Sequence, residues 1–144
     1  MIVPRGNDIA KLRNQLGLTQ KELAALFGVT LATWQKKESE TSKETIGIRP
    51  GEFQFLLLLA GEHPQYALTQ KQPVLMTEQN KPTADEVRLA REEAGLSVEQ
   101  AAALFGCLSR SWQSKENPNT RGTLTVGEYN YLLLLAGKHP YLSI

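Results

Sequence analysis

Residues 19–30 read Thr19-Gln-Lys-Glu-Leu-Ala-Ala-Leu-Phe-Gly-Val-Thr30 and contain both a helix start and a helix stop. The first four residues have the spacing of a capping box, in which the threonine and the glutamate three residues later each bond the other's backbone N–H. Gly28 ends this helix, because glycine readily takes the left-handed conformation that a sharp turn requires. Thr30 can cap a further helix that runs to about Glu38, with Trp34 facing inward. The stretch therefore predicts two short helices joined by a tight turn, which is a helix-turn-helix unit.

The same pattern occurs a second time further along the chain. A shift of 78 residues aligns Ala24-Ala-Leu-Phe-Gly28 with Ala102-Ala-Leu-Phe-Gly106, and Trp34-Gln-Lys-Lys-Glu38 with Trp112-Gln-Ser-Lys-Glu116. After a two-residue deletion, a shift of 76 aligns residues 51–64 with residues 127–140. This ordered agreement indicates a duplication. The sequence predicts an all-α fold of two tandem helix-turn-helix domains with four to five short helices each. We place the domains at residues 1–64 and 83–144 and a linker at residues 65–82.

A leucine-rich run closes each copy and is apolar at nearly every position. The runs read Phe53-Gln-Phe-Leu-Leu-Leu-Leu-Ala60 and Tyr129-Asn-Tyr-Leu-Leu-Leu-Leu-Ala136. A helix that covers one core needs only about three apolar residues in seven, so a second covered face is expected. The sister copy, or a second chain in a homodimer, would cover it; burial of both faces inside one small unit is the alternative. The predicted interface residues are Phe55, Leu58, Tyr131 and Leu134.

The first copy resembles the helix-turn-helix of the Cro/CI (XRE) family of bacterial and phage regulators. The resemblance rests on Gly17-Leu-Thr-Gln20, Leu23-Ala24, Gly28-Val-Thr30 and Glu38, and it extends over nearly all of each copy. It implies small lambda-repressor-like domains that bind double-stranded DNA, usually as dimeric repressors. It also implies that Gln20 contacts a phosphate and that the exposed side of the next helix faces base edges in the major groove.

The residues predicted to read bases lie in equivalent positions of the two copies. They are Thr30, Leu31, Ala32, Thr33 and Lys36 in the first copy, and Ser109, Arg110, Ser111 and Ser114 in the second. Leu31 and Ala32 can touch a thymine methyl but cannot hydrogen-bond a base, whereas Arg110 can bond guanine through two hydrogen bonds. The predicted phosphate ligands are Gln20, Lys21, Lys37, Lys43, Lys115 and Arg121. Val98 replaces Gln20 in the second copy, so we expect the copies to bind DNA unequally.

Composition and charge exclude several other classes of protein. The chain is 41% hydrophobic and 22% charged, as expected for a folded globular protein. Residues 1–82 carry 10 Lys and Arg against 8 Asp and Glu, or +2, and residues 83–144 carry 6 against 7, or −1, so the first copy is the better phosphate binder. The single cysteine, Cys107, excludes an internal disulfide, and no secretory or membrane-spanning segment is evident. We expect a cytoplasmic protein.

No catalytic or metal-binding pattern stands out in the sequence. His63 and His139 are equivalent, precede prolines and have no recurring partners of ligand type, so we expect them to cap helix C-termini. We therefore expect no enzyme activity and no cofactor. The favoured function is a sequence-specific transcriptional regulator, most simply a repressor. The alternative is a protein-interaction module, such as an antitoxin or adaptor, whose second domain no longer reads DNA.

Overall fold

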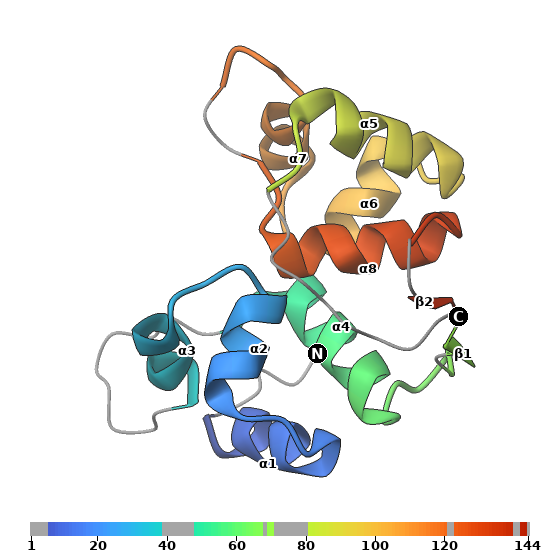
Figure 1. Cartoon of the computed structure of the whole chain (residues 1–144). Coiled ribbons are helices and arrows are strands. Elements are labelled where there is room, and N and C mark those ends of the chain that lie inside the picture. The colour runs from blue at the N-terminus through green and yellow to red at the C-terminus, as the bar shows by residue number, and fades with distance from the viewer. Residues whose placement is uncertain are drawn as a thin grey trace.

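In the computed structural model of the chain, the helices of the described residues form two similar groups of four (Figure 1). The structure describes residues 6–38, 48–67, 81–120 and 123–139, together with the backbone of residues 69–70 and 142–143. The first repeat consists of α1 (Gly6–Leu16), α2 (Gln20–Leu26), α3 (Leu31–Glu38) and α4 (Pro50–Ala60). The second repeat consists of α5 (Ala84–Glu93), α6 (Val98–Leu104), α7 (Ser109–Lys115) and α8 (Val126–Ala136). The predicted all-α class is confirmed.

Several helices begin or end at a residue that favours a helix boundary. Thr19, Thr83 and Ser97 each form a complete capping box. Thr30 caps α3 as predicted, because its Oγ1 accepts a hydrogen bond of 3.1 Å from the backbone N–H of Thr33. Gly28, at φ 67°, turns the chain between α2 and α3.

Each repeat has an aromatic centre built from equivalent residues, namely Phe27, Trp34 and Phe55 in the first and Phe105, Trp112 and Tyr131 in the second. In the first repeat, the ring centroid of Phe27 lies 5.0 Å from that of Trp34 and 5.5 Å from that of Phe55. The corresponding distances in the second repeat are 5.1 and 5.7 Å. These tilted pairs are favourable aromatic contacts. Both tryptophans are fully buried, which confirms that they belong to the core.

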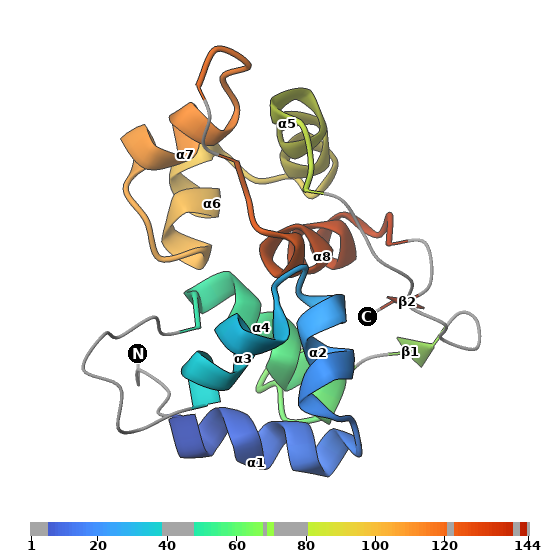
Figure 2. The same cartoon turned by 60° about the vertical axis from the view of Figure 1, so that its left-hand side comes forward.

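The leucine-rich helices α4 and α8 lie at the middle of the molecule and pack against each other (Figures 1 and 2). Every residue from Gly51 to Ala60 and from Val126 to Ala136 is buried or half-buried, so each helix is covered all round. The sister repeat supplies the second cover that the apolar runs predict. Beyond these helices, the two-residue strands β1 (Thr69–Gln70) and β2 (Leu142–Ser143) pair antiparallel. No helix in the described part of the chain is long and apolar enough to cross a membrane.

Candidate nucleic-acid interface

In the first repeat, the predicted base-reading residues lie along the outer side of α3. Leu31, Ala32 and Lys36 are exposed, and Leu31 keeps 41% of its surface although it is a large apolar residue. Thr33 is half-buried and bonds the cap, since Thr30 Oγ1 donates to Thr33 Oγ1 at 2.9 Å. The outer side of α3 therefore offers two apolar side chains and one ammonium to a partner.

The equivalent side of α7 is more polar. Arg110, Ser111 and Ser114 are exposed and Ser109 is half-buried. The hydroxyl of Ser114 donates to the carbonyl of Arg110 at 3.3 Å, within the same helix. At the helix start, Leu108 takes the place of Thr30, forms no side-chain cap bond and is 76% exposed. The two outer surfaces thus share a position in the fold but differ in chemistry.

A carboxylate at the end of α3 holds this helix to the rest of its repeat. Arg13 in α1 donates to Glu38 through Nε at 2.7 Å and through Nη2 at 3.1 Å. Trp34 Nε1 and Gln20 Nε2 donate to the same carboxylate. Burial would raise the pKa of Glu38, but the hydrogen bonds from Arg13, Gln20 and Trp34 outweigh it and lower this pKa. A charged, fully bonded carboxylate fixes the direction of α3.

The second repeat has the same arrangement at α7. Arg91 donates to Glu116 at 2.6 and 3.1 Å, and Trp112 Nε1 also donates to this carboxylate. Sequence reasoning missed the arginine partners of Glu38 and Glu116. Arg13 and Arg91 differ by 78 positions, as do the two glutamates, so alignment of the repeats contained the signal.

The predicted phosphate ligands differ in how accessible they are. Lys21 is exposed, while Gln20 and Lys115 are half-buried. Lys43 and Arg121 lie outside the described residues. The prediction that Lys37 binds a phosphate is wrong, because its side chain is only 6% exposed and its Nζ lies 3.7 Å from Glu52 Oε1. Trp34 and Lys37 are three residues apart, so both project to the inner side of α3. We therefore remove Lys37 from the phosphate-binding set.

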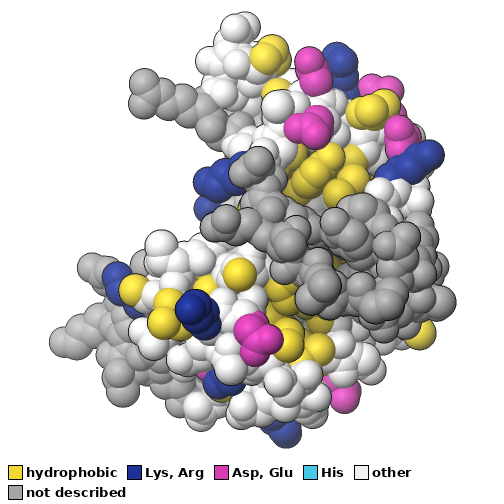
Figure 3. All heavy atoms as spheres, in the orientation of Figure 1, with side chains coloured by type: hydrophobic (Ala, Val, Ile, Leu, Met, Phe, Trp, Pro, Cys, Tyr) yellow, Lys and Arg dark blue, Asp and Glu magenta, His cyan; other side chains and the backbone are white. Residues whose placement is uncertain are grey.

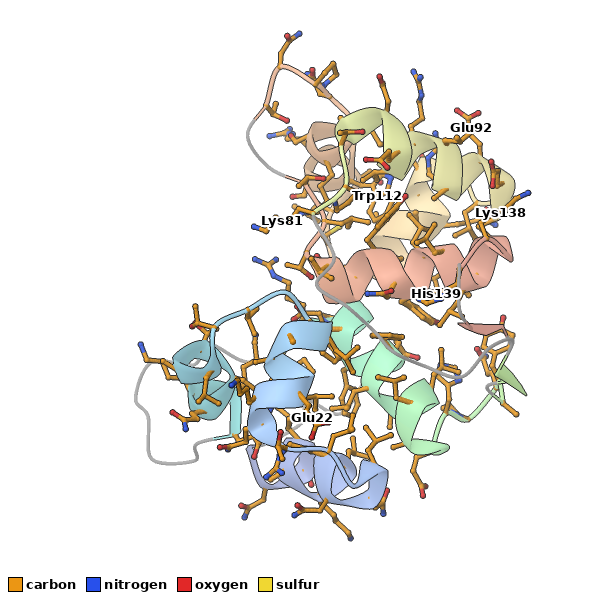
Figure 4. All side chains as sticks on the ribbon, viewed as in Figure 1. Glu22, Lys81, Glu92, Trp112, Lys138 and His139 are labelled. Carbon is orange, nitrogen blue, oxygen red and sulfur yellow. The ribbon has the colours of Figure 1, made fainter. Side chains whose placement is uncertain are left out.

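The helices α3 and α7 lie on the same side of the molecule, in the left half of Figure 2. The space-filling view shows a hollow between the two repeats on this side, with basic side chains on its upper and lower rims (Figure 3). Lys81 points out at the edge of this hollow (Figure 4) and is exposed. Sequence reasoning missed Lys81 because it treated residues 65–82 only as a linker. We call the outer sides of α3 and α7, with Lys81 between them, the bipartite surface.

All four predicted interface residues, Phe55, Leu58, Tyr131 and Leu134, are buried. Two of them form ring contacts with the opposite repeat: Phe55 lies 6.5 Å from His139 and Tyr131 lies 6.3 Å from His63, between ring centroids. Burial raises the pKa of Tyr131 to about 12, and Tyr66 adds to this shift. Figure 4 shows His139 beside α8, to the right of Lys81 and away from it.

The two histidines are structural, although not in the predicted way. The helix C-caps are Gly61 and Gly137, both in the left-handed conformation, so the prediction of histidine caps is wrong. His63 Nε2 instead bonds Gln54 Oε1 at 2.6 Å, and its Nδ1 accepts from the backbone N–H of Gln65. His139 Nε2 bonds Asn130 Oδ1 at 2.7 Å.

The remaining chemistry-bearing groups among the described residues form no second site. Cys107 is half-buried, and this burial raises the pKa of its thiol. Among the described residues, no group of three His, Cys, Asp or Glu side chains could hold a metal ion. Comparisons of the chain with models of protein families, with curated proteins and with solved structures found no match.

Proposed function

We propose that this chain is a sequence-specific regulator of transcription that binds double-stranded DNA through two lambda-repressor-like helix-turn-helix domains. The observation that carries the proposal is the bipartite surface, in which α3 and α7, each with an exposed side, lie on one side of the molecule (Figure 2). The DNA major groove is wide enough to admit an α-helix. Two helices on one side of a protein can therefore enter two grooves of one duplex.

The side chains on this surface suit different parts of the duplex. Arg110 can donate two hydrogen bonds to guanine, and Leu31 can contact a thymine methyl group. We assign Lys36, which the sequence placed among the base-reading residues, to phosphates together with Lys81, because any basic side chain can neutralise a phosphate whatever the base sequence. The bonds to Glu38 and Glu116 hold both helices in place before DNA arrives, which reduces the entropy lost on binding.

Occupation of a promoter by such a protein would exclude RNA polymerase, so the simplest regulatory outcome is repression. This mechanism requires neither a catalytic group nor a cofactor. Both repeats would take part, with the first supplying more of the phosphate contacts because its half of the chain has a net charge of +2 against −1.

One observation favours a protein-interaction role for the second repeat. Leu104 and Leu108, at the end of α6 and the start of α7, are 40% and 76% exposed. Large apolar residues that gather on a surface are typical of a protein interface. An antitoxin or adaptor would use this surface for a protein partner and bind DNA through the first repeat alone.

Selection of bound fragments from random duplex DNA by the purified full chain tests the proposal. We expect a defined sequence to be enriched, and its affinity in gel-shift titration to fall steeply with salt because bound phosphates release counterions. Lys36→Ala should weaken binding, while Arg88→Ala, an exposed change on α5, should not. Failure to enrich any sequence would overturn the proposed function.

A further inference from the structure

The contacts between the two repeats occur in reciprocal pairs. Gly28 meets Val126, and the equivalent residues meet in the opposite sense as Gly106 and Pro50. A Cβ on Gly28 would lie 2.4 Å from Val126 Cγ2, and a Cβ on Gly106 would lie 2.5 Å from Pro50 Cγ. Such distances leave no room for any side chain, so the glycine backbone of each repeat packs directly on a side chain of the other.

Two further pairs follow the same rule. Gly51 packs on Phe105 and Gly127 packs on Phe27, and in each case an added Cβ would lie 2.5 Å from the ring Cδ2. The ring contact of Phe55 with His139 likewise matches that of Tyr131 with His63. In all three cases, a contact between residue i of one repeat and residue j of the other has a counterpart with the roles exchanged.

This reciprocity determines how the repeats are related in space. A head-to-tail arrangement brings two different patches together, and exchanged contacts do not arise from it. An approximate twofold axis brings the same patch of each repeat against itself, and every contact then occurs twice. The duplicated halves are therefore related by a rotation, although they follow one another along the chain.

We propose that one chain, acting as a monomer, binds one DNA site made of two inverted half-sites of different sequence. The inference rests on the proposed DNA binding. If α3 and α7 enter one duplex, the approximate twofold axis must coincide with a dyad of the DNA, so the half-sites run in opposite directions. A duplication that preserved direction would require direct repeats instead.

The half-sites differ because the two reading surfaces differ. The exposed groups of α3 are Leu31, Ala32 and Lys36, while the equivalent positions of α7 hold Ser109, Arg110 and Ser114. A second copy of the chain is not needed to complete the site, because α4 and α8 already cover each other's apolar sides. Native mass spectrometry of the complex with the selected duplex should therefore show one chain per site.

The direction of dissimilar half-sites cannot be read from a selected sequence, so the decisive variant makes the reading helices identical. Leu108→Thr, Ser109→Leu, Arg110→Ala, Ser111→Thr and Ser114→Lys together give α7 the residues of α3. Four of the five positions are exposed and Ser109 is half-buried, so we expect the fold to persist. Circular dichroism melting checks this, and Arg88→Ala serves as the control for selection.

The expected result is that the wild-type chain selects an asymmetric site, whereas the fivefold variant selects an inverted repeat of the wild-type half-site assigned to α3, with one chain bound in both cases. Direct repeats, two chains per site, or a site that occupies one groove only would overturn the inference while leaving DNA binding intact. If the wild-type chain selects no DNA at all, the proposed function fails and this inference fails with it.

Discussion

At equivalent positions at the start of α4 and α8, the two repeats each bury a glutamate, yet they surround it differently. In the first repeat, Glu52 is 1% exposed, faces the ammonium of Lys37 at 3.7 Å and accepts a 2.9 Å hydrogen bond from Thr125 of the other repeat. In the second repeat, Glu128 is 3% exposed and forms no salt bridge within the described residues. Lys115, the equivalent of Lys37, is only half-buried.

The difference shows how a duplicated scaffold has diverged at its interface. Glu52 links three elements, because Thr125 at the start of α8 and Lys37 at the end of α3 both contact its carboxylate. The orientation of α3 is thereby tied to the contact between the repeats. Within the described residues, the carboxylate of Glu128 accepts a hydrogen bond only from the backbone N–H of Thr125, and the backbone N–H of Glu128 donates to the Thr125 hydroxyl. One buried carboxylate is thus paired and the other is not.

The largest expected effect comes from neutralising the paired carboxylate. Glu52→Gln should destabilise the fold by roughly 3–5 kcal/mol, because loss of one partner leaves the other charge buried and uncompensated. Glu128→Gln, the same change at the equivalent position, should leave stability unchanged or slightly raised at neutral pH. Urea denaturation followed by circular dichroism measures both. Equal losses for the two variants would remove the proposed distinction between the carboxylates.

The interface glycines provide the next comparison, with controls inside the same chain. Gly17 and Gly28 both have φ near 70°, but a Cβ on Gly17 meets nothing within 4 Å, whereas one on Gly28 meets Val126. Both alanine variants share the cost of the left-handed conformation. Only Gly28→Ala adds overpacking, so its loss of stability should exceed that of Gly17→Ala by about 1–3 kcal/mol.

The equivalent pair in the second repeat tests whether the interface is reciprocal. Gly95, like Gly17, has open space around it, and Gly106 faces Pro50. Gly106→Ala should therefore exceed Gly95→Ala by a similar amount in the same denaturation assay. If the additional loss of stability occurs in one repeat only, the two halves of the interface contribute unequally to stability. The approximate twofold relation would then describe the geometry of the interface but not its energy.

For DNA binding, the comparison is between Arg110 in α7 and Lys36 in α3, which belong to different repeats. Arg110→Ala should weaken binding by about 1–3 kcal/mol and relax the preference at one base pair of its half-site, as expected for a bidentate contact. Lys36→Ala should weaken binding to all sequences and reduce the salt dependence. Fluorescence anisotropy with single-base variants of the selected site distinguishes the two patterns. A uniform loss for Arg110→Ala would indicate a phosphate contact instead.

Much of the fold could be predicted because short-range signals determine it. The capping boxes at Thr19, Thr83 and Ser97 fix helix starts from four adjacent residues each. The excess of leucine in residues 53–60 and 129–136 indicates a second covered face, since apolar surface on both sides of a helix must be buried. Residues three apart lie on the same face of a helix, so the buried Trp34 would have predicted that Lys37 lies on the buried face of α3.

The relation between the repeats could not be predicted in the same way. A duplication in sequence is compatible with a translation or a rotation, because both keep each repeat intact. Only contacts between residues far apart in the chain, such as that of Gly28 with Val126, distinguish them. The pairing of Arg13 with Glu38 also depends on how α1 and α3 pack, so the spacing of 25 residues carries no local signal.

The smallest expected effect is a difference in pH dependence between the wild-type chain and Glu128→Gln. Burial raises the pKa of Glu128, and the nearby charge of Glu52 raises it further, while Thr125, Arg49 and Lys115 oppose the shift. Between the ordinary glutamate value and this raised value, the folded state binds more protons than the unfolded state. The contribution of Glu128 to stability therefore falls as the pH rises through this window, and it stays low above the raised pKa.

A glutamine at position 128 cannot titrate, so the stability of Glu128→Gln relative to wild type should increase across the window and then level off. Urea denaturation of both proteins at a series of pH values measures this difference, in which the other carboxylates cancel. A relative stability that does not vary with pH would show that Glu128 has the same pKa in the folded and the unfolded chain. The proposed difference between the surroundings of Glu128 and Glu52 would then be wrong.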